Sequence, residues 1–191
     1  MIPPAPLIVV SGPSGVGKTT VVERLLAAAN LPLRRAVTAT TRDPRPGEVD
    51  GTDYHFWGRG EFLKAIDDGR MLEWASVFDT DFYGTPRSEV DEYRAKGVGV
   101  FLVIDVQGAA RVRELLPDDH LSVFIAPPSF EELEARLRGR KDMSEERVLR
   151  RLTTAEDELA QADRFHHRIV NRELAAAVSE LDRIVRARFN T

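Results

Sequence analysis

The 191-residue chain contains no cysteine. This absence excludes disulfide bridges, thiolate metal sites and cysteine nucleophiles, so a packed core has to stabilise the fold and any catalysis needs other groups. Hydrophobic residues make up 42% of the chain, which is enough for such a core, and the length suits one mid-sized domain.

The chain also lacks an excess of positive charge and any long apolar run. Its net charge is −4, which argues against a protein that mainly binds nucleic acid. Met1–Pro6 has neither the basic nor the apolar part of a secretory signal, and no apolar run approaches the roughly 20 residues that span a bilayer. We therefore expect a cytoplasmic enzyme with small-molecule partners, and neither a nucleic acid nor a membrane as partner.

Buried strands alternate with helical patterns along much of the chain. Leu7–Ser11 is a short apolar run of the kind that is buried on both faces of a sheet, and a glycine-rich turn and a helical pattern follow it. Further pairs of strand and helix are expected at Val98–Ile104 with Gly108–Leu116 and at Leu121–Ile125 with Phe130–Leu137. This alternation predicts an α/β fold with a parallel sheet flanked by helices, whose ligands gather at the carboxyl ends of the strands.

Two segments depart from this alternation. Residues 36–95 are rich in Thr, Arg, Pro, Gly and aromatics, and we interpret them as a small lobe inserted into a core formed by residues 1–35 and 96–191. Arg136–Arg151 is strongly charged, and by composition alone it is a solvated pair of surface helices. The C-terminal part indicates two amphipathic helices, at Ser144–Asp163 and Arg172–Arg188, around a short strand at Arg168–Val170.

The glycine-rich turn matches the phosphate-binding pattern G-x-x-x-x-G-K-[ST] at every defined position. Its residues are Gly12, Pro13, Ser14, Gly15, Val16, Gly17, Lys18 and Thr19. The glycines let the loop turn its N–H groups inward, and the positive end of the following helix adds to a site for phosphate oxygens. Lys18 is expected to reach the β- and γ-phosphates of ATP and the Thr19 hydroxyl to bind Mg²⁺. Because the pattern follows a buried strand and opens a helix, a chance glycine-rich turn is the weaker interpretation.

A second anion site is predicted in the inserted lobe. Residues 38–56 concentrate hydroxyl groups, two arginines and a tyrosine around tight turns. Guanidinium groups bind phosphate oxygens in a bidentate manner, so this lobe can hold a monophosphate.

At these residues the chain resembles the guanylate kinase family. Thr40–Phe56 matches the family's run T-T-R-x-P-R-x-G-E-x-x-G-x-D-Y-x-F. The likeness extends in family order over essentially the whole chain, through residues 72–75, 83–85, 105–108, 124–128, 136–140 and 169–171. The resemblance implies a P-loop kinase fold with a GMP-binding lobe at about 36–95, a mobile lid at about 136–151, ATP and GMP as substrates, and Mg²⁺ as cofactor.

The resemblance also implies roles for individual residues. The GMP phosphate would be bound by Arg42, Arg45, Tyr54 and Tyr83, and guanine by Thr38, Glu73, Thr85 and Asp105. One carboxylate can accept both N1–H and N2–H₂ of guanine, whereas adenine would leave it unpaired, and sites of this kind discriminate by up to about 10⁴–10⁵. Asp105 ends a strand, where an acidic residue also lies near the metal, so it can act on guanine, on Mg²⁺ through water, or on both.

Catalysis of phosphoryl transfer needs positioning and charge neutralisation, and no nucleophilic side chain is expected. The predicted catalytic residues are Lys18, Arg42, Arg136, Arg140 and Arg151, the last three by resemblance to the family's lid arginines, and Asn171 matches a position near the adenine of ATP. The chain departs from the family pattern at Lys141, at Arg172–Glu173 and at Asp81–Phe82. Two other functions remain open at this stage: a catalytically inactive domain of the same family that binds phosphopeptides, and a kinase for another monophosphate.

Overall fold

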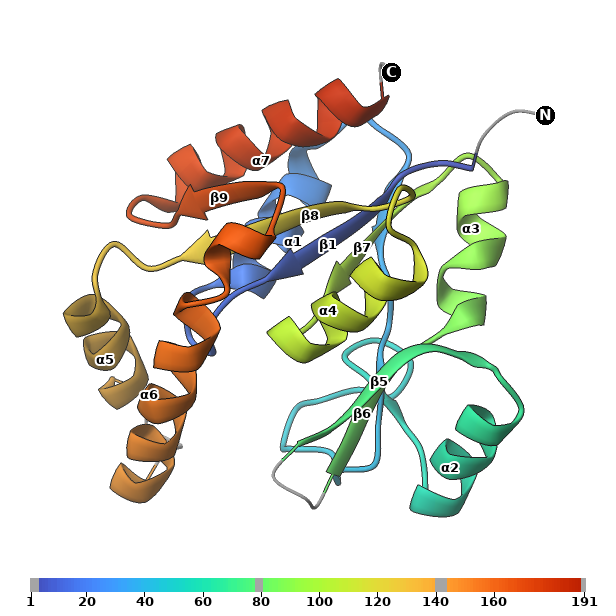
Figure 1. The fold of residues 1–191 in the computed structure, drawn as a ribbon, viewed down its shortest axis with the longest axis horizontal. Helices are drawn as coiled ribbons and strands as arrows, with labels where there is room; N and C mark the ends of the chain where they lie inside the picture. The colour runs from blue at the N-terminus through green and yellow to red at the C-terminus, as the bar shows by residue number, and fades with distance from the viewer. Residues whose placement is uncertain (1–3, 78–80, 140–143, 190–191) are drawn as a thin grey trace. The chain divides into compact units, whose positions relative to one another are not determined.

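The computed structural model describes residues 4–77, 81–139 and 144–189 (Figure 1). Five strands form one sheet in the order β2-β7-β1-β8-β9. Their bounds are β1 (Leu7–Ser11), β2 (Leu33–Arg35), β7 (Gly99–Val103), β8 (Leu121–Ala126) and β9 (His167–Val170). The pairs β1–β8, β2–β7 and β8–β9 are parallel, and the predicted α/β fold with a parallel sheet is confirmed.

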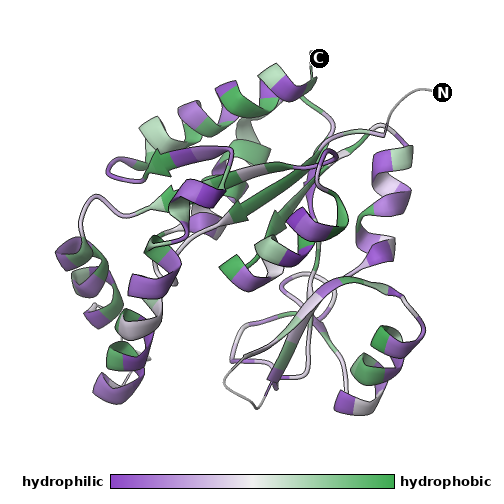
Figure 2. Cartoon of the chain, in the orientation of Figure 1, coloured by the Kyte–Doolittle hydropathy of each residue, from purple (hydrophilic) through white to green (hydrophobic). Residues whose placement is uncertain are grey.

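The apolar runs of the sequence are the buried strands of this sheet. Every residue of β1 and of β8 is buried, which is why neither strand shows the alternation of a half-exposed strand. Figure 2 shows these strands as continuous hydrophobic segments, in contrast to the mixed colours of the helices. The helices that accompany the sheet are α1 (Lys18–Ala28), α4 (Val106–Leu115), α5 (Phe130–Arg138), α6 (Glu145–Leu159) and α7 (Leu174–Phe189).

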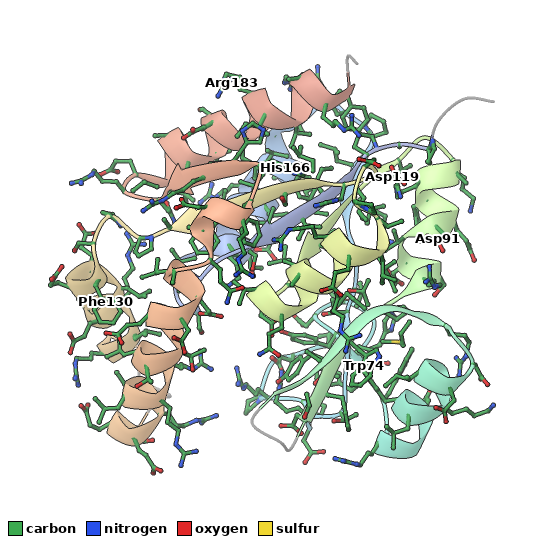
Figure 3. All side chains as sticks on the ribbon, viewed as in Figure 1. Trp74, Asp91, Asp119, Phe130, His166 and Arg183 are labelled. Carbon is green, nitrogen blue, oxygen red and sulfur yellow. The ribbon has the colours of Figure 1, made fainter. Side chains whose placement is uncertain are left out.

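A second sheet has the order β4-β3-β6-β5 and lies entirely in the residues predicted to form the lobe. Its strands are β3 (Ala39–Thr40), β4 (His55–Phe56), β5 (Met71–Val77) and β6 (Asp81–Pro86). Helix α2 (Arg59–Asp67) contributes Phe62 and Ala65 to a small core with Ala39 and Met71, against which Trp74 of β5 packs (Figure 3). The short helices η1 (Arg87–Glu89) and α3 (Asp91–Ala95) follow, and η2 (Ala162–Arg164) precedes β9.

The chain divides into two compact units. The first consists of Met1–Leu7, Pro32–Leu102 and Gln107–His120, and the second of Ile8–Leu31, Val103–Val106 and Leu121–Thr191. The first unit is larger than the predicted lobe at 36–95 because it also contains β2, β7 and α4. In the second unit α1 packs against α7, and α5 packs against α6 (Figure 1).

Strands β1, β7 and β8 agree with the sequence patterns to within one or two residues, but α6 ends at Leu159 and not at Asp163, and β6 was not predicted. Its glycine and proline are poor strand formers, and its structure depends on pairing with β5 in the register Glu73↔Thr85. Within the described ranges, no helix has the length and apolar character needed to cross a membrane.

Candidate functional site

The glycine-rich loop that is predicted to bind phosphate connects β1 to α1, and its shape requires glycine. Gly12, Gly15 and Gly17 all have positive φ values, of 137°, 86° and 96°. A Cβ atom on Gly12 would lie 2.1 Å from the carbonyl oxygen of Ile125 on β8, and one on Gly15 would lie 2.8 Å from Leu137 Cδ2 on α5. The predicted glycines are therefore needed both for the turn and for close packing.

Lys18 folds back over this loop. Its Nζ donates hydrogen bonds to the carbonyl oxygens of Gly12 at 2.6 Å and Pro13 at 3.1 Å. Burial lowers the pKa of Lys18, while the negative charges of Glu158 and Asp105 act in the opposite direction. The structure thus brings Asp105 into the electrostatic surroundings of Lys18.

Helix α6 contacts the loop through two charged side chains. Arg151 Nη1 donates a hydrogen bond to the Ser14 hydroxyl. Glu158, two turns later on the same helix, is 8% exposed and accepts a hydrogen bond from the Ser14 N–H. Burial raises the pKa of Glu158, and the nearby Lys18 charge opposes this shift.

Glu158 was not among the predicted site residues. The sequence does contain a signal for it, because Val148, Leu152, Ala155 and Glu158 share the buried face of α6. A carboxylate at a core position of an amphipathic helix is rare unless it is paired, so it points to a partner elsewhere in the fold.

The structure describes Arg136, one of the predicted lid arginines. Arg136 Nη2 donates to the backbone oxygen of Asn171 at 3.0 Å and lies 3.5 Å from Glu132 Oε2. Arg136 and Asn171 are therefore brought together at the end of β9. Arg140 lies outside the described residues, as does Lys141.

The donor atoms beside the loop suit a magnesium ion that is bound mainly by its substrate. Thr19, in the first turn of α1, is exposed, and Asp105 lies near Lys18. The described residues contain no cluster of three or more His, Cys, Asp or Glu side chains that could hold a metal ion. Because Mg²⁺ keeps several waters and takes one or two protein oxygens together with substrate phosphates, a hydroxyl and a carboxylate fit its requirements.

The predicted monophosphate site is built around Arg42. Its Nη1 and Nη2 atoms donate to the two carboxylate oxygens of Glu48, both at 2.9 Å, and its Nε donates to the Tyr83 hydroxyl at 3.2 Å. The Arg42 guanidinium lies 5.4 Å from the ring centre of Tyr54, whose pKa is raised by burial. The hydrogen bonds to the Glu48 carboxylate raise the pKa of Arg42.

A tight turn positions Glu48. The Glu48 N–H donates to the Arg45 oxygen at 3.0 Å, with Pro46 and then Gly47 at the centre of the turn, where Gly47 has a φ of 90°. The Arg45 N–H returns a hydrogen bond to Glu48 Oε2 at 2.7 Å, while Arg45 as a whole is exposed. Glu48 was not predicted as a site residue, although it is the glutamate of the family's run T-T-R-x-P-R-x-G-E-x-x-G-x-D-Y-x-F.

The predicted guanine-reading residues Glu73 and Thr85 meet across β5 and β6. The Thr85 hydroxyl donates to Glu73 Oε1 at 2.6 Å, and the two residues are 0% and 4% exposed respectively. Gly84 allows the two strands to approach this closely, because a Cβ atom at Gly84 would lie 2.6 Å from the backbone carbonyl oxygen of Glu73. Thr38 is half-buried, and its carbonyl oxygen accepts the His55 N–H at 2.8 Å.

Known proteins resemble this chain over nearly its whole length. A family model described as guanylate kinase matches residues 5–188. Guanylate kinases of Rubrobacter xylanophilus and Gloeobacter violaceus are 47% and 49% identical, each over 94% of this chain and over 93% and 86% of their own lengths. The crystal structure of guanylate kinase from Anaplasma phagocytophilum has a TM-score of 0.81 at 34% identity, covering 98% of this chain and 88% of that one. A shikimate kinase structure from Bacteroides thetaiotaomicron, with a TM-score of 0.54 at 16% identity over 95% of this chain and 98% of that one, shares the fold alone.

Proposed function

Because this chain belongs to the guanylate kinase family, we propose that its two anion sites bind ATP and GMP, and that a phosphate oxygen of GMP attacks the γ-phosphorus of ATP in line. As a guanylate kinase it is an ATP:GMP phosphotransferase that forms ADP and GDP. The attacking group belongs to the substrate, so no side chain has to form a covalent intermediate.

On the donor side, we assign the ATP phosphates to the loop from Gly12 to Gly17 and to the amino end of α1. The N–H groups of such a loop provide fixed donors, and the helix dipole favours the negative charge. Lys18 reaches the β- and γ-phosphates by exchanging the carbonyl oxygens of Gly12 and Pro13 for phosphate oxygens, which carry more negative charge. Arg151, and with it Arg136 and Arg140, neutralises charge that develops during transfer.

We assign Mg²⁺ to the Thr19 hydroxyl, with Asp105 as a further ligand through water. When bound, the ion would supply positive charge that neutralises the phosphate oxygens during transfer. Asp105 also supports the charged state of Lys18, so its carboxylate contributes to the donor site with or without a direct role toward guanine.

On the acceptor side, Arg42, Arg45, Tyr54 and Tyr83 bind the GMP phosphate. The choice of GMP over other monophosphates rests on one observation, the buried pair of Glu73 and Thr85. The Thr85 hydroxyl donates to Glu73 Oε1, and we assign guanine N1–H and N2–H₂ to the Glu73 carboxylate. The Thr38 hydroxyl is the donor that we assign to O6.

A coupled assay of ADP formation with GMP, dGMP, AMP, CMP and UMP tests this function. We expect turnover with GMP and dGMP alone, loss of activity when a chelator removes divalent cations, and recovery when Mg²⁺ is added. Turnover with AMP in place of GMP would assign another acceptor. An absence of turnover with every monophosphate would indicate a binding domain without catalysis. The setting we propose for this activity is the cytoplasm.

A further inference from the structure

Asn171 follows β9 directly, and the structure fixes its backbone on both sides. Its N–H donates to the Ala126 oxygen at the end of β8 at 2.8 Å. Its carbonyl oxygen accepts from Arg136 Nη2 at 3.0 Å. With the main chain held in this way, the side-chain amide extends from a fixed point in the sheet.

That amide contacts the phosphate-binding loop. Asn171 Nδ2 donates to the Val16 oxygen at 2.8 Å, across 155 residues of sequence, and Asn171 is only 8% exposed. A backbone carbonyl can accept but not donate, so the amide must direct its NH₂ group to Val16 and the orientation of the amide is defined.

The loop needs this donor because of its own geometry. When a loop turns its N–H groups toward a phosphate, its carbonyl groups point into the protein, where each needs a hydrogen-bond donor. The Val16 N–H donates to the Pro13 oxygen at 3.3 Å, and the Val21 N–H donates to the Gly17 oxygen at 3.0 Å. Val16 is fully buried, and its oxygen is served by Asn171.

Gly17 provides the space for this contact. A Cβ atom on Gly17 would lie 2.7 Å from Asn171 Nδ2, closer than such atoms can approach. Gly17 also has a φ of 96°, so a side chain there would both strain the backbone and displace the amide. The last glycine of the loop and Asn171 therefore form one structural unit.

Building on the proposed function, we propose that Asn171 is a positioning residue that holds the phosphate-binding loop in shape for the donor triphosphate, whatever base the donor carries. This role differs from a contact with the adenine ring. A residue that reads adenine affects donors with that base, whereas a residue that shapes the loop affects every nucleoside triphosphate alike.

The test compares Asn171→Ala with the parent protein, using ATP and ITP as donors and GMP as acceptor. We expect the KM for both donors to rise by about the same factor, roughly tenfold, since one hydrogen bond to a buried carbonyl is lost. The KM for GMP should stay within about twofold, and the ratio of kcat/KM for ATP to that for ITP should stay at the parent value. Asn30→Ala, at an exposed position after α1, is the matched control and should change nothing.

Loss of activity with ATP alone, so that the preference for ATP over ITP disappears, would overturn the inference in favour of adenine recognition. Unchanged donor KM values would overturn it as well. Should Asn171→Ala fail to fold, Asn171→Ser is used instead. Its shorter side chain does not reach the Val16 oxygen, but its hydroxyl group keeps the buried position polar.

Calorimetric titration with inorganic tripolyphosphate separates this inference from the proposed function, because it requires no acceptor and no base. A weaker affinity in Asn171→Ala than in the parent supports the role of Asn171 even if GMP proved to be the wrong acceptor. An equal affinity contradicts it even if GMP is phosphorylated normally.

Discussion

Replacing Glu73 with glutamine tests how the acceptor base is recognised. The change keeps the size of the side chain but removes its charge and turns one acceptor into a donor. In the structure Glu73 is buried and already accepts the Thr85 hydroxyl at 2.6 Å, so water cannot compensate for a mismatched group. The amide NH₂ of glutamine must then face either guanine, which offers only donors at N1 and N2, or Thr85.

The magnitude follows from these contacts. Thr85 can rotate its hydroxyl to accept, so the protein itself adapts, but guanine loses at least one hydrogen bond to a charged acceptor. Such a bond contributes about 1.5–3 kcal/mol, and an unpaired buried donor costs about 1–3 kcal/mol more. A total of about 2.5–6 kcal/mol corresponds to a decrease of about 10²–10⁴ in kcat/KM for GMP, at 1.36 kcal/mol for each factor of ten.

Steady-state kinetics with varied GMP and with varied ATP measures this effect. The loss should appear with GMP and dGMP, while the KM for ATP stays near the parent value. Glu92→Gln, which makes the same chemical change at an exposed position on α3, serves as control. A Glu73→Gln enzyme that uses GMP as well as the parent would refute the assignment of Glu73 to guanine.

Three further changes test the remaining parts of both sites. Lys18→Ala should lower kcat by about 10²–10³ at an unchanged melting temperature, because it removes a phosphate-directed charge that burial already disfavours. Glu48→Ala should raise the KM for GMP about tenfold and leave that for ATP unchanged, because Arg42 loses two hydrogen bonds and the turn at Arg45 loses one. Glu89→Gln should lower the free energy of unfolding by about 1–2 kcal/mol at pH 7, a figure that allows for partial exposure, and by progressively less as the pH falls below about 4.3.

The pH dependence at Glu89 has a definite sign. Burial raises the pKa of Glu89, but hydrogen bonds from Val37 N–H, Arg34 and His55 outweigh it and hold the pKa below its ordinary value. A carboxylate of this kind contributes stability above the pKa of the unfolded chain, about 4.3, and the contribution is lost as the pH falls through the lower folded value. Urea unfolding of parent and variant at pH 7 and at a series of lower pH values measures the difference, and a difference that does not shrink as the pH falls would contradict the ionic origin.

The Lys18 variant has a matched control, and each of the other two variants has an outcome that would contradict its assigned role. Lys64→Ala removes an exposed lysine and should leave kcat unchanged. A Lys18→Ala enzyme with nearly full kcat would contradict the role of Lys18 at the phosphates. A lower KM for GMP in Glu48→Ala would mean that Glu48 competes with the phosphate and does not support Arg42.

The conformation of the glycine-rich loop could be predicted from sequence because its residues are contiguous and its geometry is local. Gly12, Gly15 and Gly17 adopt the positive φ values that the pattern requires, and Lys18 begins the helix that follows a buried strand. The buried strands could be predicted for a similar reason, since a strand covered on both faces has to be apolar throughout.

The pairing of distant residues could not be predicted in this way. Arg151 lies 137 residues from Ser14 and Asn171 lies 155 residues from Val16, and no pattern within either segment names its partner. The position of Asn171 near adenine is implied only by resemblance to the family, and the contact of its side chain that the structure shows is with the loop.

Residue types and their spacing along the chain were thus sufficient for the fold class, the loop and the family. Tertiary structure alone decided which charges face Lys18, which carboxylate holds Arg42 and which side chains support the loop. The physical reason is that a buried polar group needs a partner within about 3 Å, and folding brings such partners together from elements that are remote in sequence.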